Sequence, residues 1–231
     1  MIGLIGAMKI EVDNLKKVMT GLKSTVISNI EFSTGKINNV ECVVAISGVG
    51  KVNAAMCTQT MILNFSPDFI INVGVAGAVS ENIKICDVVF VDYVLQHDMD
   101  TSGVGDEKGM ISGINLIKIP CSKKINNKLL GASKYIKNTN FHVGTVMTGD
   151  QFINDKKTLI SLKNEFGGVA CEMEAAAIGQ VCYINKVDFA VVRAISDNAN
   201  DNATFDYALF IQKAAKISND LILSLINNFN E

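Results

Sequence analysis

The strongest chemical signal in the sequence is a polar ending to an apolar run near residue 190. The run Val191–Asp197 begins with two valines and also contains Arg193 and Ser196. A buried strand that ends on an acid places that acid where a pocket opens, because carboxylates avoid apolar interiors unless something is gained there. Arg193 is the only arginine of the chain. We therefore expect Arg193 and Asp197 to have specific roles at a pocket.

Polar side chains or glycine turns also follow four other apolar runs that we expect to be strands. These are Glu11, Gly74–Gly77, Gly149–Asn154 and Glu172–Glu174. Since ligands bind at the carboxyl ends of parallel strands, we expect all five strand ends to converge on one cleft. Three carboxylates, the aromatic Phe152 and a glycine turn around one cavity suit the cleavage of a glycosidic bond. One acid would serve the leaving group, another would activate water, and a polar clamp would hold sugar hydroxyls.

Alternating strand and helix patterns place these residues in an α/β fold. The predicted strands are residues 2–6, 25–34, 40–47, 69–73, 88–94, 143–147, 169–173 and 189–195, and the predicted helices are 9–19, 51–65, 126–136, 156–165, 174–184 and 205–229. Asn38 and Asn39 suit a tight hairpin turn. We expect one domain over residues 1–231, built as three α/β/α layers around a central mixed, mainly parallel sheet.

Composition excludes some classes of binding partner and indicates the cellular compartment. A net charge of −2 over 231 residues offers no electrostatic surface for nucleic acid or an acidic membrane. The longest uncharged apolar stretch, residues 69–79, is too short to cross a bilayer. The six cysteines show no Cys-x-x-Cys spacing, which is typical of buried, reduced thiols. We expect a cytoplasmic protein that binds neither nucleic acid nor membrane.

The sequence resembles, almost from end to end, the bacterial 5′-methylthioadenosine/S-adenosylhomocysteine nucleosidases of the purine nucleoside phosphorylase superfamily. The resemblance depends on five segments in order. They are Gly3–Met8 with Glu11, Ser47–Val52, Gly149–Ile153, Glu172–Ala175 and Arg193–Asp197. Each segment alone is weak, whereas the five in this order and spacing are specific. The resemblance implies a nucleoside phosphorylase-like fold, purine thionucleosides as substrates, no cofactor and a homodimer.

The resemblance also implies a role for individual residues. Glu11 would activate the attacking water, and Asp197 would protonate adenine N7. Glu174 and the Met173 backbone would hold the ribose hydroxyls, while Phe152 would stack on adenine and the Ile153 backbone would read its edge. The remaining residues expected to bind substrate are Gly77, Arg193, Ser196, Val49 and Phe205. These roles agree with an oxocarbenium-like transition state, in which carboxylates meet electron demand at the sugar and a proton meets electron excess on the base.

Protonation of Asp197 near neutral pH requires a raised pKa, which burial beside apolar residues would supply. Arg193 would oppose that shift if it pointed at Asp197, so we expect it to face the carboxylates around the water. Glu172 is expected to support the site without touching substrate. The simplest alternative reading of Glu11 is a residue that complements a helix dipole. That of Asp197 is a cap of the next turn, and that of Phe152 is a core residue.

No metal site is expected. His97, Asp98 and Asp100 are read as solvated loop residues, because no fourth ligand follows at a suitable spacing. His142 is read as structural. The turn at residues 6–8 lacks the Gly-x-Gly-x-x-Gly pattern of a dinucleotide site.

Three departures from the family pattern concern the site. Lys9-Ile10 replaces an acidic pair before Glu11, which would change the field at the entrance. Val75 stands where relatives often have serine, so Asp197 would depend more on Ser196 for its orientation. The loop at residues 101–113 lacks the aromatic residues often found there, which changes the pocket for the 5′ substituent.

Three functions fit these residues. They are hydrolysis of methylthioadenosine and S-adenosylhomocysteine, phosphorolysis by a relative of the nucleoside phosphorylases, and purine binding without catalysis. Phosphorolysis needs several cationic donors for a dianion, and one arginine is too few. The presence of Glu11, Glu174 and Asp197 together argues against binding alone. In the homodimer we expect the loop between Asp100 and Gly113 to reach the neighbouring subunit's site, with Thr101, Val104, Met110 and Ile111 as apolar walls.

Overall fold

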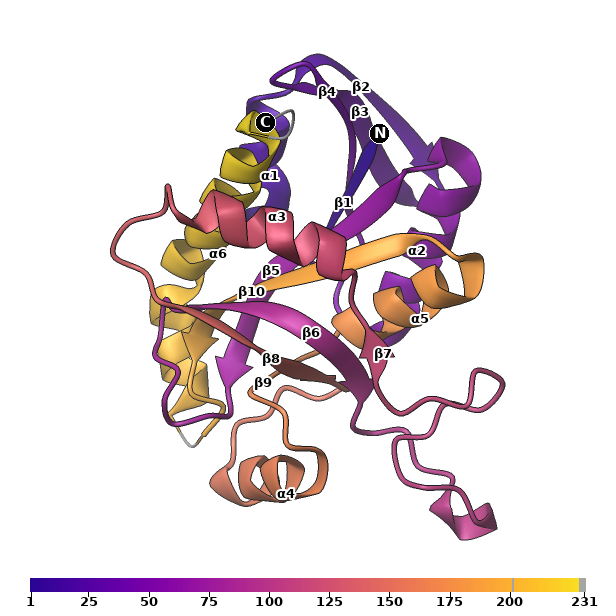
Figure 1. The fold of residues 1–231 in the computed structure, drawn as a ribbon, viewed down its shortest axis with the longest axis vertical. Coiled ribbons are helices and arrows are strands. Elements are labelled where there is room, and N and C mark those ends of the chain that lie inside the picture. The colour runs from indigo at the N-terminus through magenta and orange to yellow at the C-terminus, as the bar shows by residue number, and fades with distance from the viewer. Residues whose placement is uncertain (201, 229–231) are drawn as a thin grey trace.

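The computed structural model describes residues 1–200 and 202–228, which form ten strands and six α-helices (Figure 1). The strands are β1 (Ile2–Gly6), β2 (Thr20–Ile27), β3 (Ile30–Ile37), β4 (Val40–Ile46), β5 (Phe69–Ala78), β6 (Val88–Gln96), β7 (Ile119–Pro120), β8 (Phe141–Thr148), β9 (Ala170–Glu172) and β10 (Asp188–Asp197). The helices are α1 (Lys9–Lys17), α2 (Lys51–Phe65), α3 (Lys123–Ser133), α4 (Lys156–Phe166), α5 (Ala175–Asn185) and α6 (Ala203–Asn227), with a short 3-10 helix at Ser102–Val104.

All ten strands belong to one mixed sheet. Its path runs β2-β3-β4-β1-β5-β10-β6-β8-β9, and β7 pairs with β6. The short β9 pairs in parallel with β8 and antiparallel with the far end of β5, so strands β5, β10, β6, β8 and β9 close into a ring. In the whole sheet, five of the ten strand pairings are parallel and five are antiparallel. The antiparallel share is larger than the sequence pattern indicated.

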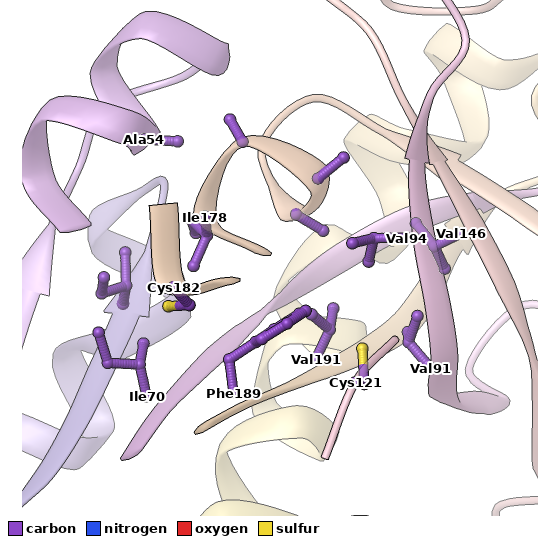
Figure 2. Close-up of a cluster of buried hydrophobic side chains, with 14 of the residues drawn as sticks. Ala54, Ile70, Val91, Val94, Cys121, Val146, Ile178, Cys182, Phe189 and Val191 are labelled. Atoms are coloured by element: carbon purple, nitrogen blue, oxygen red, sulfur yellow. The ribbon is translucent and has the colours of Figure 1, made fainter. Parts of the chain in front are cut away.

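Helices cover both faces of the sheet, which confirms the expected α/β class with three layers. Helices α1, α3 and α6 lie on one face, and α2 and α5 lie together on the other (Figure 1). Figure 2 shows the core on the second face, where Ala54 of α2 and Ile178 and Cys182 of α5 belong to one buried cluster with sheet residues such as Ile70 and Val191. On the first face, Leu15 and residues of α3 and α6 pack against the sheet in the same way. Burial of apolar surface on both faces stabilises the sheet.

The N-terminal half of the fold contains a hairpin that the sequence did not reveal. The predicted strand at 25–34 is two strands, β2 and β3, joined by a turn in which Ser28 and Asn29 both have positive φ. Strand β2 lies at the sheet edge with almost all of its residues exposed, so it has no apolar alternation to detect. The expected turn at Asn38 and Asn39 is confirmed, with positive φ at both residues.

The last helix was predicted at residues 205–229 and begins two residues earlier, at Ala203. Its predicted final residue, Phe229, lies outside the described residues. Within the described part of the chain, no helix is both long and apolar enough to span a membrane.

The long strands β5 and β10 bring the predicted site residues together. They run parallel, with Arg193 opposite Gly74 and Asp197 opposite Gly77. The register shifts between Ile195 and Asp197, so Ser196 is the extra residue of a bulge. Bulges turn side chains away from the regular alternation and occur often next to active sites. This one places Ser196 and Asp197 at the same cleft.

Candidate active site

The carboxyl ends of the central strands surround an open cleft with about 460 Å³ of empty space. The lining residues are Ala7, Met8, Glu11, Val49, Val75, Ala76, Gly77, Phe152, Cys171, Glu172, Met173, Glu174, Ser196, Asp197 and Tyr207. Ile153 is buried and lines a smaller hollow that shares Phe152, Gly77 and Asp197 with the cleft.

Glu11 is the third residue of α1 and is only 3% exposed. Its Oε2 accepts hydrogen bonds from the backbone N–H groups of Ala7 (2.8 Å) and Met8 (2.9 Å). Its Oε1 accepts one from Val75 N of β5 at 3.1 Å. The carboxylate therefore caps the start of its helix, where the alternative reading expected it to complement the dipole, and it also lines the cleft. Burial raises the pKa of Glu11, although Arg193 and the three backbone donors oppose the shift.

Gly74 allows the carboxylate of Glu11 and the guanidinium of Arg193 to approach the same point of β5. A Cβ atom at Gly74 would lie 2.6 Å from Glu11 Oε1 and 3.3 Å from Arg193 Nη1. A side chain at this position would displace the carboxylate of Glu11. Glycine at position 74 therefore keeps the carboxylate where it is.

Arg193 lies beneath the cleft at 1% exposure and does not line it. Its Nη2 donates to Glu172 Oε2 at 2.6 Å and to Asn72 Oδ1. Burial disfavours the charged guanidinium, but attraction to Glu172 and Glu11 outweighs it and raises the pKa of Arg193. The arginine is thus turned toward carboxylates, and Asp197 is not among its bonding partners.

Glu172 supports the other groups from the end of β9. Besides Arg193, its carboxylate accepts hydrogen bonds from Thr148 Oγ1 and from the N–H groups of Glu174 (3.0 Å) and Ala175 (2.8 Å). These last two donors belong to the first turn of α5, where a negative charge is favourable. Glu172 therefore neutralises Arg193 and fixes the start of the helix that carries Glu174.

Asp197 is 2% exposed at the end of β10. Its Oδ2 accepts a hydrogen bond from Ser196 Oγ at 2.8 Å, and its Oδ1 accepts one from Ala199 N at 2.8 Å. Burial raises the pKa of Asp197 against these two hydrogen bonds. Gly77 permits the approach, since a Cβ there would lie 2.7 Å from Asp197 Oδ1. The carboxyl is oriented by Ser196, as the sequence suggested.

Glu174 precedes α5 and is 7% exposed. Its Oε1 accepts a hydrogen bond from Gly50 N at 2.8 Å. Burial, followed by repulsion from Glu172, raises the pKa of Glu174 to about 8. A carboxyl group that titrates near neutral pH in a cleft is typical of functional sites.

Val75 lines the cleft, and its backbone N–H donates to Glu11. Gly77 and Met173 line the cleft as expected, and Val49 does so while remaining 47% exposed.

The aromatic wall of the cleft is formed by Phe152 and Tyr207, whose rings meet edge to face at 5.5 Å. Phe205, expected here, is 71% exposed and absent from the lining. The two residues lie on different faces of α6, since Tyr207 shares the inward face with Ala203. Extending the predicted core stripe of α6 backward from Phe210 by three residues would have identified Tyr207.

The histidines lie outside the cleft. His97 is 5% exposed, so its prediction as a solvated residue was wrong; its ring packs on the backbone of Gly149, where a Cβ would lie 2.3 Å from Nε2. Asp98 forms an ion pair with Lys51, and Asp100 is a loop residue bonded to Ser102. His142 binds Asp87 at 2.9 Å, away from the cleft. Among residues 1–200 and 202–228, no group of three or more such side chains could hold a metal ion.

Comparison with known proteins identifies the class to which this fold and cleft belong. The model of the phosphorylase superfamily matches residues 1–227, so the chain belongs to that superfamily. Within it, the chain belongs to the 5′-methylthioadenosine/S-adenosylhomocysteine nucleosidases. The relative from Geobacillus sp. (strain WCH70) is 37% identical over 235 residues, which cover 100% of this chain and 99% of the relative. The relative from Staphylococcus aureus (strain bovine RF122 / ET3-1) is 39% identical over 228 residues, which cover 98% and 99%.

Solved structures agree with this placement. The Neisseria meningitidis nucleosidase in complex with methylthio-immucillin-A has a TM-score of 0.94 and 29% identity, with 98% of each chain covered. The futalosine hydrolase of Helicobacter pylori strain 26695 has a TM-score of 0.93 and 31% identity, with 98% of this chain and 97% of that chain covered. The family makes this protein an enzyme that hydrolyses N-ribosyl bonds.

Proposed function

We propose that this enzyme hydrolyses the N-glycosidic bond of 5′-methylthioadenosine and S-adenosylhomocysteine, releasing adenine and the 5-thio-substituted ribose. Glu11 accepts a proton from the attacking water, and Asp197 donates one to adenine N7. Glu174 with the Met173 backbone holds the ribose hydroxyls, and Phe152 stacks on the base. The relatives' names supply the two substrates.

The observation that carries the proposal is the presence of three buried carboxyl groups with different partners in one cleft. Asp197 is held by one hydroxyl and one N–H group and has a raised pKa, which suits a proton donor. Burial raises the pKa of Glu11 as well, but the cation of Arg193 and three backbone N–H donors favour its ionised form, which suits a group that accepts a proton. These features support Asp197 as the acid for the base and Glu11 as the carboxylate for the sugar, the two groups that an oxocarbenium-like transition state requires.

The cation content of the cleft favours hydrolysis over phosphorolysis. None of its described lining residues is lysine or arginine. Arg193 is already bonded to Glu172 and Asn72 beneath the surface. A phosphate dianion in this cleft would meet carboxylates without a free cation, which is unfavourable in a partly buried site.

Adenine release from methylthioadenosine, measured with and without phosphate, tests the reaction. We expect equal rates in both conditions, and we expect Glu11→Gln and Asp197→Asn each to lower kcat by on the order of 10² while the fold is kept. Strict phosphate dependence with a sugar 1-phosphate product would contradict hydrolysis. Futalosine is the comparison substrate, because a similar structure is a futalosine hydrolase. Faster release from futalosine than from either thionucleoside would reassign the substrate.

We also propose that the enzyme is a homodimer. Helix α2 exposes Val52 (77%), Leu63 (71%) and Met56 (41%), and Val49 at the cleft edge continues this face. An apolar stripe of this kind on a helix suits a second copy of the chain.

We propose a cytoplasmic location as well. Five of the six cysteines are buried and all six are free thiols, which supports this location.

The loop expected to reach the partner's site contributes fewer residues than the sequence suggested. Ile111 is 4% exposed and belongs to the core of its own subunit, so it is not available as a wall for the partner. Val104 is 85% exposed and remains available. Sedimentation at micromolar concentration of the wild type and of Val52→Asp tests the dimer, and a monomeric wild type with full activity would contradict it. A dimer whose KM ignores deletion of residues 102–106 would contradict the shared pocket.

A further inference from the structure

A cluster of charged and amide side chains lies outside the described lining of the cleft, where the turn before α2 meets the ends of β6 and β8. Lys51, the first residue of α2, is central to this cluster. Its Nζ donates to Asp98 Oδ1 at 2.6 Å and to Gln96 Oε1 at 3.1 Å. Its side chain is 19% exposed and that of Asp98 is 23% exposed, so the ion pair is largely shielded from water. Shielded pairs are screened less by salt than surface pairs.

Asp150 completes the cluster from the end of β8. Its backbone N–H donates to Asp98 Oδ2 at 2.9 Å, and its own Oδ1 accepts from the backbone N–H of Lys51 at 2.8 Å. Asp98 thus binds the side chain of Lys51 and the backbone of Asp150, while Asp150 binds the backbone of Lys51. Three hydrogen bonds in a closed circuit fix three segments of the chain relative to one another.

The residue fixed most directly by this circuit is Gly50. It adopts φ 97° and packs so closely on Asp150 that a Cβ would lie 3.0 Å from Asp150 Oδ1. A non-glycine residue would be strained in this conformation. The N–H of Gly50 points to Glu174 Oε1 at 2.8 Å. A second link, Gln96 Nε2 to Gln180 Oε1 at 2.7 Å, connects the same cluster to α5, the helix that follows Glu174.

We propose that Lys51, Asp98 and Asp150 are positioning residues that hold the Gly50 N–H against Glu174, and so set the orientation and the charge of the carboxyl group that faces the ribose. The ribose contact rests on the proposed function. The positioning itself rests only on the distances above.

Several other groups act on Glu174 from the elements packed around it. Burial and the carboxylates of Glu172 and Glu11 favour its neutral form, whereas the Gly50 N–H and the cation of Arg193 favour its ionised form. The phenol of Tyr207 also lies close enough to interact with Glu174. Since the hydrogen bond from Gly50 favours the ionised form, its loss would raise the pKa of Glu174 above the value that burial and repulsion already give it.

Two substitutions separate positioning from a simple charge effect. Lys51→Met removes a positive charge and keeps the length of the side chain, whereas Asp98→Ala removes a negative charge. If the substitutions acted through charge alone, Lys51→Met would raise the pKa of Glu174 and Asp98→Ala would lower it. If they acted through the position of Gly50, both would raise this pKa. We expect both variants to raise the pKa by about 1 unit, measured by carbon NMR of the carboxyl group with Glu174→Gln for assignment.

Kinetics with methylthioadenosine provide the second readout. We expect Lys51→Met and Asp98→Ala to raise KM about 10-fold with kcat changed less than about 3-fold, and we expect neither to add to the effect of Glu174→Ala. Lys216→Met is the matched control, because Lys216 forms an exposed ion pair with Asp220 on the outer surface of α6. It should change neither quantity.

Opposite pKa shifts in the two variants, or an unchanged pKa in both, would overturn the inference. So would KM effects that add fully to that of Glu174→Ala. A wild type that releases no adenine would instead refute the proposed function, and the NMR measurement would still decide the positioning.

Discussion

The hydroxyl of Ser196 lies 2.8 Å from Oδ2 of Asp197, its neighbour in the bulge of β10. In a regular strand, adjacent side chains point to opposite faces. The bulge removes this alternation, so a hydroxyl donor and a carboxyl group from consecutive positions meet in the cleft. Irregular backbone at this point is therefore part of the site.

The first prediction concerns the pH dependence that this contact controls. The Ser196 hydroxyl stabilises the ionised form of Asp197, so Ser196→Ala raises the pKa of Asp197 further. If Asp197 acts as an acid, it stays protonated to higher pH in the variant. We expect the basic limb of kcat/KM against pH to move upward by about 1 pH unit. Ser218→Ala, which removes a buried hydroxyl of α6, is the control. A limb that stays in place or moves downward would exclude Asp197 as the acid.

The second prediction concerns stability and Glu174. Burial, and then repulsion from Glu172, raises the pKa of Glu174 to about 8 in the folded protein. In an unfolded chain the pKa of a glutamate is about 4.3. Between these values the folded state binds the proton more tightly, so the free energy of unfolding falls as pH rises. Glu174→Gln has no such proton. We expect the variant to gain stability over the wild type from pH 5 to 8, on the order of 3 kcal/mol.

Thermal unfolding of both proteins at a series of pH values measures this difference. Parallel curves of Tm against pH for wild type and Glu174→Gln would show that Glu174 is already ionised in the folded protein at pH 5.

The elements that local sequence determines were predicted well. Strand β1 and helix α2 begin and end where the apolar pattern and the flanking residues indicate. Glu11, Glu174 and Asp197 were placed at one cleft because each follows a strand whose end is readable. Strand β2 was missed because its exposed residues carry no periodic signal, and its position is set by pairing with β3.

Contacts between distant segments were not predictable in the same way. The closure of β9 onto β5 involves only two residue pairs, Gly77 with Cys171 and Ala78 with Ala170, and depends on the curvature of the whole sheet. The burial of His97 depends on the absence of a side chain at Gly149, more than fifty residues further along the chain. The Lys51–Asp98 pair joins the ends of different elements, and nothing in either local sequence indicates the partner.

The third prediction concerns the buried ion pair between Arg193 and Glu172. Arg193→Met leaves the carboxylate of Glu172 buried without its cation, which costs about 3–5 kcal/mol. Glu172→Gln keeps an acceptor for the N–H groups of α5 but removes the charge. We expect the double variant to be more stable than Arg193→Met alone, with a coupling of about 1–3 kcal/mol in urea unfolding. The exposed pair Lys216–Asp220 should show a coupling below about 1 kcal/mol. Additive losses at Arg193 and Glu172 would mean that each acts through other neighbours.

The last prediction distinguishes the two aromatic residues at the start of α6. Tyr207 lines the cleft and meets the ring of Phe152, whereas Phe205 is 71% exposed. We expect Tyr207→Ala to raise KM for methylthioadenosine about 10-fold and Phe205→Ala to leave it unchanged, because only the first removes a wall of the cleft. The Tyr207 hydroxyl contacts the sulfur of Met8 at 3.3 Å, a weak acceptor, so Tyr207→Phe should stay within about 3-fold of wild type. Steady-state kinetics of the three variants measure these effects. If Phe205→Ala raises KM as much as Tyr207→Ala does, Phe205 must reach a cleft other than that of its own subunit, and the exposed start of α6 would then belong to the dimer contact.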